Sequence, residues 1–118
     1  MTTNKGLIRK VEALKSELER LSKKGVKIRI AAPLTKENES AIREVMKFAE
    51  IRDNKSVNAR FCIIDDKEFM FMVLDDEEVH PSYDVGVWVN TPFFATALTN
   101  LFDACWKNMT PVEKVLSK

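Results

Sequence analysis

Three polar residues, Asn58, Arg60 and Asp65, stand within a largely apolar stretch, VNARFCIIDDKEFMFMV. In an extended strand the side chains alternate between two faces, so Asn58 and Arg60 share one face and lie about 7 Å apart. A guanidinium beside an amide suits an anion, a carboxylate or a sugar hydroxyl. The alternative is an edge strand that Arg60 keeps soluble. The residues alone leave both interpretations open.

Other chemistry is scarce in the chain. It has no Gly-rich phosphate loop, no HExxH helix and no GxSxG elbow. The only histidine, His80, lies in the acidic segment 75–84 without a second histidine or a nucleophile beside it, which favours exposed polar surface. Consecutive carboxylates rarely converge on one cation, and Cys62 and Cys105 lack CxxC spacing. We therefore predict no metal and no cofactor.

Length and composition describe one soluble domain. The chain has 118 residues, of which 45% are hydrophobic and 31% charged, with 3 Gly and 4 Pro. It contains neither an apolar run of about 18 residues nor a secretory signal, so we predict a cytoplasmic protein without membrane contact. The net charge is +1, but residues 1–30 hold nine Lys or Arg against three Glu. Such a segment can face phosphates or an acidic partner, although a solvated helix face is the favoured interpretation.

The first 24 residues are predicted to form a dimerisation helix, from residue 4 to residue 24. Its apolar residues recur at heptad spacing, and Gly25 is placed to end the helix. The seam consists of Leu7, Val11, Leu14, Leu18 and Leu21. This seam is narrower than the apolar stripe of a helix that covers a sheet, which favours pairing with the same helix of a second copy.

Residues 25–110 are predicted to form a mixed α/β domain of about five strands flanked by helices. The strands are expected at 26–30, 50–54, 57–64, 68–74 and 85–90, and the helices at 35–49 and 92–106, with Thr35 and Thr91 as caps. Asp65 to Lys67 form a hairpin turn, and residues 111–118 form a lightly packed tail. The predicted core contains Trp106, Phe102, Leu98, Phe61, Phe71, Ile28 and Ile30.

The spacing of Asn58, Arg60 and Asp65 resembles the HxKxxxxD motif of the phospholipase D superfamily. The segment SKKGVKIRIAAP resembles the first strand of that family, and ARFCIIDDKEFMF resembles its motif strand and hairpin. In the family the histidine is the nucleophile, but the amide of Asn58 has no basic lone pair with which to attack. No Gly-Ser pair follows at the usual distance. The resemblance implies a phospholipase D-like fold without catalysis, so we predict no enzyme.

A second resemblance accounts for a motif without its nucleophile. From about Leu7 to Asn108, including the ending VWVNTPFFATALTNLFDACW, the chain is similar to the C-terminal effector domains of TrmB-like archaeal transcriptional regulators. Members of that family sense small ligands, often sugars, and place a winged helix-turn-helix before a dimer helix. The resemblance implies a non-catalytic regulatory domain that binds a small polar or anionic ligand through Asn58, Arg60, Asp65 and His80. DNA would then be bound only by a separate helix-turn-helix domain, which we do not expect within this chain.

A homodimer is the expected assembly. Active phospholipase D folds bring two motif copies together about a twofold axis, so a dimer would set two copies of Arg60 face to face. Two guanidinium groups repel unless an anion or a polar ligand lies between them. The remaining alternatives are a pure oligomerisation module, a phosphodiesterase and a direct DNA binder that uses the basic helix. The sequence leaves the ligand and the target genes open.

Overall fold

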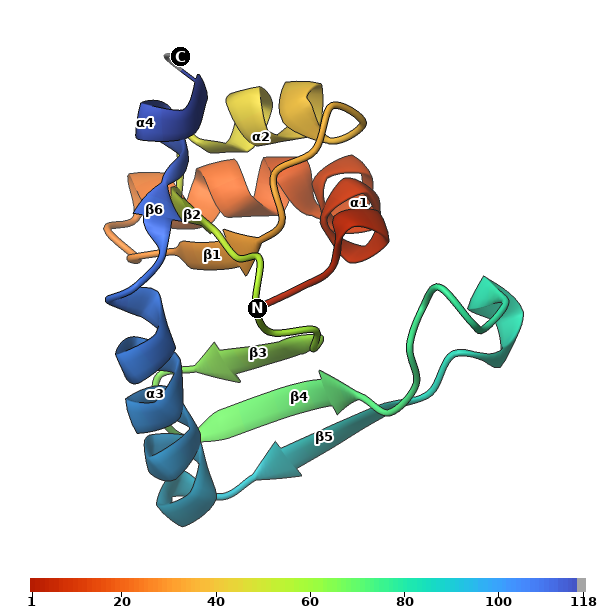
Figure 1. Cartoon of the computed structure of the whole chain (residues 1–118). Coiled ribbons are helices and arrows are strands. Elements are labelled where there is room, and N and C mark those ends of the chain that lie inside the picture. Colours follow the sequence, from red (N-terminus) through yellow and green to blue (C-terminus); the bar gives the residue numbers. More distant parts are fainter. Residues whose placement is uncertain (117–118) are drawn as a thin grey trace.

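The computed structural model describes residues 1–116, which form a mixed α/β fold (Figure 1). The helices are α1 (Asn4–Lys23), α2 (Glu39–Val45), α3 (Pro92–Trp106) and α4 (Val112–Leu116), with a short 3-10 helix at Pro81–Tyr83. The strands are β1 (Arg29–Ala32), β2 (Glu50–Asp53), β3 (Phe61–Ile64), β4 (Glu68–Met72), β5 (Gly86–Asn90) and β6 (Thr110–Pro111). None of these helices combines the length and the apolar character needed to span a bilayer.

The strands form two three-stranded sheets, whereas the sequence predicted a single sheet of about five strands. In the first sheet β1 runs parallel to β2, and β6 adds antiparallel to β2. The second sheet is the antiparallel order β3-β4-β5. Asn54 separates them, because its side chain accepts hydrogen bonds from the amides of Ser56 and Val57 and donates to the Val57 carbonyl. This turn leads the chain out of the first sheet before β3 begins.

The first two residues of the chain connect the two sheets. The amide of Thr2 donates to the Ala31 carbonyl in β1 at 2.9 Å, and the amide of Phe61 in β3 donates to the Met1 carbonyl at 2.9 Å. In Figure 1 the N-terminus accordingly lies between β1 and β3. The N-terminal segment thus supplies the backbone link between two sheets that are otherwise separate.

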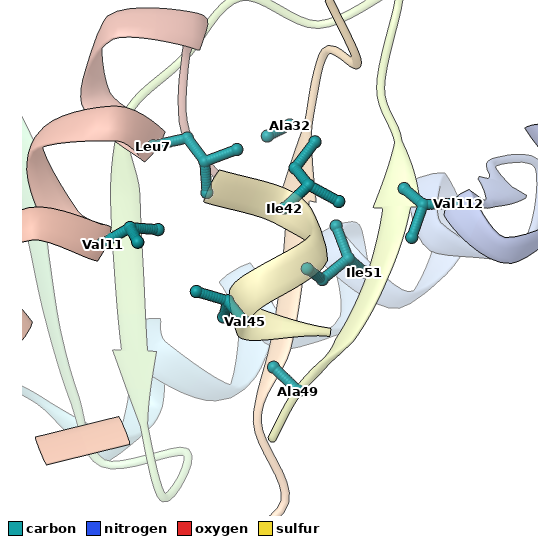
Figure 2. Close-up of a cluster of buried hydrophobic side chains, with 8 residues drawn as sticks. All are labelled: Leu7, Val11, Ala32, Ile42, Val45, Ala49, Ile51 and Val112. Atoms are coloured by element: carbon teal, nitrogen blue, oxygen red, sulfur yellow. The ribbon is translucent and has the colours of Figure 1, made fainter. Parts of the chain in front are cut away.

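Helices α1 and α2 pack over one face of the first sheet and enclose the main apolar cluster (Figure 2). The cluster consists of Leu7, Val11, Ala32, Ile42, Val45, Ala49, Ile51 and Val112. Leu7 and Val11 of the predicted dimer seam are therefore enclosed in this chain's own core. Leu18 packs against the same cluster, Leu21 is half-buried, and Leu14 is 44% exposed. A role of α1 in dimerisation stays a prediction, but the two buried residues are inaccessible to a partner.

Helix α3 packs beside both sheets. A second cluster of buried apolar side chains there joins one sheet to the other. Phe102 and Trp106 are buried there with Met1 and Ala31, which confirms both aromatic residues as core. The other predicted core residues, Leu98, Phe61, Phe71, Ile28 and Ile30, are half-buried. The guanidinium of Arg52 lies 4.6 Å from the Trp106 ring and donates to the Trp106 carbonyl at 2.7 Å. The end of α3 is thereby fixed to the first sheet.

Several predicted boundaries shift in the structure. The strand expected at 26–30 begins only at Arg29, and the helix expected from Thr35 begins after Asn38. Thr91 caps α3 as predicted, accepting from the Phe94 amide. Residues 111–116, expected as a lightly packed tail, lie in β6 and α4 instead, and Val112 is fully buried. The last two residues of the predicted tail, 117–118, lie outside the described part.

Replacing Leu7 by Ala tests whether the seam of α1 belongs to the core. The Leu7 side chain is 1% exposed, so we expect Leu7→Ala to lower the free energy of unfolding by about 2–5 kcal/mol through the cavity it leaves. Leu14→Ala, one heptad later on the same helix, should cost less than about 1 kcal/mol. Urea denaturation of the two variants measures both values, and equal losses would contradict the packing of α1 described above.

Candidate functional site

The four residues predicted as ligand contacts do not converge. Asn58 and Arg60 precede β3, whereas Asp65 lies in the turn that follows it, so β3 separates them. His80 lies in the segment 75–84, where its Nδ1 accepts from the Ser82 amide at 3.1 Å and its ring lies 6.3 Å from the ring of Tyr83. Among the four, only Asn58 and Arg60 line the same pocket.

Asp65 serves the hairpin turn between β3 and β4. Asp65 and Asp66 have φ values of 53° and 56°, the left-handed conformation that a tight hairpin turn requires and that Asp tolerates. The amide of Lys67 closes the turn by donating to the Ile64 carbonyl at 3.1 Å. Thr99 of α3 donates its hydroxyl to the Asp66 carboxylate at 2.7 Å. The hairpin was predicted correctly, and Asp65 has a structural reason to occupy its position.

Arg60 is a buried charge whose guanidinium is already bound within the chain. Its side chain is 7% exposed, and Nη1 and Nη2 donate to the two carboxylate oxygens of Asp84 at 2.6 and 2.9 Å. Nη2 also donates to the Leu74 carbonyl at 2.6 Å. The paired arrangement raises the pKa of Arg60, chiefly through the hydrogen bond to Asp84, and the same bond lowers the pKa of Asp84. Arg60 therefore needs no external anion, and two facing copies would each carry their own counterion.

A second carboxylate, Asp76, joins this network to the start of α1. Its Oδ2 accepts from the Thr3 hydroxyl at 2.5 Å and lies 3.8 Å from Arg60 Nε. The Asp76 side chain is fully buried. Lys10 of α1 lies near these charges. Burial lowers the pKa of Lys10, the positive charge of Arg60 lowers it further, and the negative charge of Asp76 raises it. We call Arg60, Asp76, Asp84 and Thr3 the Arg60 network.

Gly6 permits the close approach of α1 to this network. Thr3 caps the helix by accepting from the Gly6 amide at 3.1 Å. A Cβ atom at position 6 would lie 2.3 Å from Thr2 Oγ1, 3.0 Å from Thr3 Oγ1 and 3.5 Å from Arg60 Cδ. A side chain at position 6 would therefore force the Thr2 hydroxyl to move and would press on the capping hydroxyl of Thr3.

A pocket of about 380 Å³ lies beside the Arg60 network. Its polar lining comes from the start of α1, the approach to β3 and the segment after β4; the residues are Thr3, Asn58, Arg60 and Asp75. Its apolar lining consists of Ala59, Phe61, Phe71, Met72, Val73 and Leu74. Asn58 is exposed at the pocket, and no partner for its amide is recorded among the described residues. This exposed amide can therefore both donate to and accept from a ligand.

The sequence identified Arg60 but missed Thr3, Asp76 and Asp84. Thr3 had a local signal, since a threonine before an apolar helix is typical of an N-cap. Asp76 and Asp84 had none, because they lie in a run of acidic residues that reads as a solvated loop. Across the described residues, no group of three or more His, Cys, Asp or Glu side chains is arranged to hold a metal ion. Cys62 is exposed, Cys105 is half-buried, and both are free thiols.

Comparisons with known proteins place the fold. No protein-family model matches the sequence, and a comparison with curated proteins finds no match. Among solved structures, the fold is similar to that of an archaeal chromatin protein. That protein is TrmBL2, whose structure is described as showing a novel mode of DNA binding; the similarity has a TM-score of 0.67 and 17% identity over 82% of this chain. The match spans 39% of the TrmBL2 chain, and at this identity it establishes the fold alone.

Replacing Arg60 by Met tests the network. The change keeps most of the side-chain volume but leaves the fully buried Asp76 without its cation, so we expect the free energy of unfolding to fall by about 3 kcal/mol or more. Arg43→Met, which removes an exposed cation paired with Glu39 on α2, should cost less than about 1 kcal/mol. Urea denaturation at neutral pH measures both losses. A small loss in Arg60→Met would mean that the buried pairing contributes little to stability.

Acid should destabilise the folded chain through Asp84. The pKa of this carboxyl is lowered below its usual 3.8 in the folded state, so the folded state binds fewer protons than the unfolded state in that range. Its contribution is therefore present above pH 3.8 and is lost as the pH falls through the folded pKa. We expect stability to decline below about pH 4 in the native chain and to decline less steeply in Asp84→Asn. Urea midpoints between pH 7 and pH 2.5 compare the two, and parallel curves would exclude Asp84 as the titrating group.

Proposed function

We propose that this chain is a non-catalytic regulatory domain of the TrmB-like kind that binds a small polar ligand in the pocket beside the Arg60 network. The observation that carries the proposal is the similarity of its fold to TrmBL2 over 82% of the chain. This similarity supports the TrmB-like relation predicted from the sequence. The absence of a histidine at position 58 supports a role without phosphodiester cleavage, because Asn58 cannot act as the nucleophile.

The pocket supports binding of a neutral, hydroxyl-rich compound more than binding of an anion. Its volume of about 380 Å³ falls within the range of small-molecule sites. The charge of Arg60 is already balanced by Asp84, and two further carboxylates, Asp75 and Asp76, lie on the same side. A phosphate in the pocket would meet the carboxylate of Asp75 and would find the guanidinium of Arg60 already bound by Asp84. The free Asn58 amide can donate to and accept from a hydroxyl group.

We do not assign the DNA binding described for TrmBL2 to this fold. The alternative of direct DNA binding would use the basic helix α1, but several of its cations pair with carboxylates. The pairs are Lys5 with Glu77, Lys15 with Glu44, Arg20 with Glu17 and Lys23 with Glu19. Binding to DNA needs cations that are available to neutralise phosphates and so displace the counterions of the DNA, and these carboxylates compete for them. We propose that a separate domain would bind DNA.

A thermal-shift screen tests ligand binding. Monosaccharides, disaccharides and linear polyols form one set, and inorganic phosphate and sugar phosphates form the other. At ten times its Kd a ligand adds about 1.4 kcal/mol of stability, which raises Tm by about 5 °C for a domain of this size. We expect at least one neutral compound to raise Tm and the phosphates to have no such effect.

Asn58→Ala should abolish that rise, since it removes the free amide of the pocket without touching the Arg60 network. Asn100→Ala, an exposed amide at the pocket around Trp106, is the matched control and should keep the rise. A full thermal shift in Asn58→Ala, or a screen without any response, would contradict ligand binding at this pocket.

A further inference from the structure

The outer strands of the two sheets differ in how their free backbone groups are covered. An uncovered edge strand presents unpaired N–H and C=O groups, and soluble proteins usually cover, shorten or interrupt such edges. In the described structure, the edge at β1 is met by Thr2 and the edge at β3 by Met1. The edge at β6 is two residues long and contains Pro111. This leaves β5, five residues long, as the long open edge.

The register of β5 shows which of its backbone groups are free. The Val73 amide donates to the Val85 carbonyl and the Thr91 amide to the Lys67 carbonyl, so the odd-numbered residues of β5 exchange hydrogen bonds with β4. In an antiparallel ladder the residues between them direct their N–H and C=O groups the other way. These residues are Gly86, Trp88 and Asn90. Within residues 1–116, no backbone partner for these groups is recorded.

The side chains along this edge lack the features that prevent pairing. From Val85 to Asn90 the sequence VGVWVN contains no charge and no proline. Trp88 is 66% exposed, and Phe93, at the adjoining start of α3, is 89% exposed. Across the sheet Trp88 stands beside Met70, which is also exposed. The edge thus combines unpaired backbone with apolar surface.

We propose that β5 pairs antiparallel with β5 of a second copy of this chain, about a twofold axis at Trp88. In this register Trp88 faces Trp88 of the partner subunit, and Gly86 faces Asn90 of the partner subunit. Every free N–H and C=O group of the three outward residues then has a partner. The β3-β4-β5 sheet of one copy and that of the other then form one continuous six-stranded antiparallel sheet across the dimer.

A second copy fits this edge because the segment is complementary to itself. Its free groups are placed symmetrically about Trp88, and the absence of charge means that no like charges meet across the axis. Asp84, the nearest carboxylate before the strand, is already bound by Arg60. The dimer does not depend on the proposed ligand, and it leaves the buried part of the α1 seam in the core.

Sedimentation velocity between ~5 and ~300 µM tests the assembly, because a short edge should give a dimer that dissociates in the micromolar range. We expect the mass to rise from 13.5 kDa towards twice that value. Trp88→Lys places two cations at the axis and should raise the dimer Kd at least about tenfold. Leu101→Lys makes the same kind of change at an exposed position on α3, away from the axis, and should leave the Kd within about threefold. Circular dichroism melting confirms that each variant is folded.

Disulfide trapping provides a second measurement, because it captures covalently a dimer that otherwise dissociates. In a Cys62→Ser, Cys105→Ser background, Trp88→Cys should form an intermolecular disulfide on mild oxidation, because hydrogen-bonded antiparallel pairs place Cα atoms about 5.5 Å apart. Met70→Cys in the same background should stay monomeric on a non-reducing gel. A monomer at every concentration, or a dimer that Trp88→Lys does not weaken, would overturn the proposal. If the native chain stays monomeric but still binds a neutral ligand in the thermal-shift screen, the β5 dimer is wrong and the proposed ligand binding stands.

Discussion

The buried guanidinium of Arg60 is the constraint on which the arrangement of the segment 74–84 depends. Removing one unpaired ion from water costs several kcal/mol, so the fold must bring acceptors to this position. It draws them from the Leu74 carbonyl and from Asp84, which lie at the two ends of a segment outside both sheets. Asp76 then extends the network to Thr3 and the start of α1. One charge at the entrance to β3 thus orients a loop and a helix that the sheet hydrogen bonds do not reach.

The N-terminal residues have a comparable role for the backbone. Both sheets are small, since each has three strands and no strand is longer than five residues. Met1 and Thr2 bond to β3 and to β1, and Thr3 caps α1 and binds Asp76. Three consecutive residues therefore join both sheets, the first helix and the Arg60 network. The second core cluster, with Phe102 and Trp106, packs around the same junction.

Local patterns predicted the elements better than their assembly. The order of helices and strands as far as α3, the Asp65–Asp66 turn and the Thr91 cap follow from periodicity and turn chemistry, and they appear as expected, whereas β6 and α4 were not predicted. The heptad seam of α1 suggested a partner helix, but its first two residues, Leu7 and Val11, pack with residues of α2 in the chain's own core. The division into two sheets could not be predicted, since it depends on the side chain of Asn54 and on the long-range bonds of Met1 and Thr2. At the site, the sequence found Arg60 but assigned it an external partner, because nothing in the acidic run marks Asp84 as its counterion.

The Arg60 network lies between the two surfaces to which we assign binding. Leu74 and Asp75 line the pocket, and Asp84 is followed directly by Val85 and the strand β5. The Arg60 side chain bonds to both Leu74 and Asp84, so a displacement at one end of the segment is resisted at the other. A ligand that prefers one position of Leu74 and Asp75 would therefore change the energy of the β5 edge, and pairing at that edge would change the affinity of the pocket by the same factor. In the regulatory domain proposed above, this reciprocity would give the buried ion pair a role beyond stability, because it would connect occupancy of the pocket to assembly at the β5 edge.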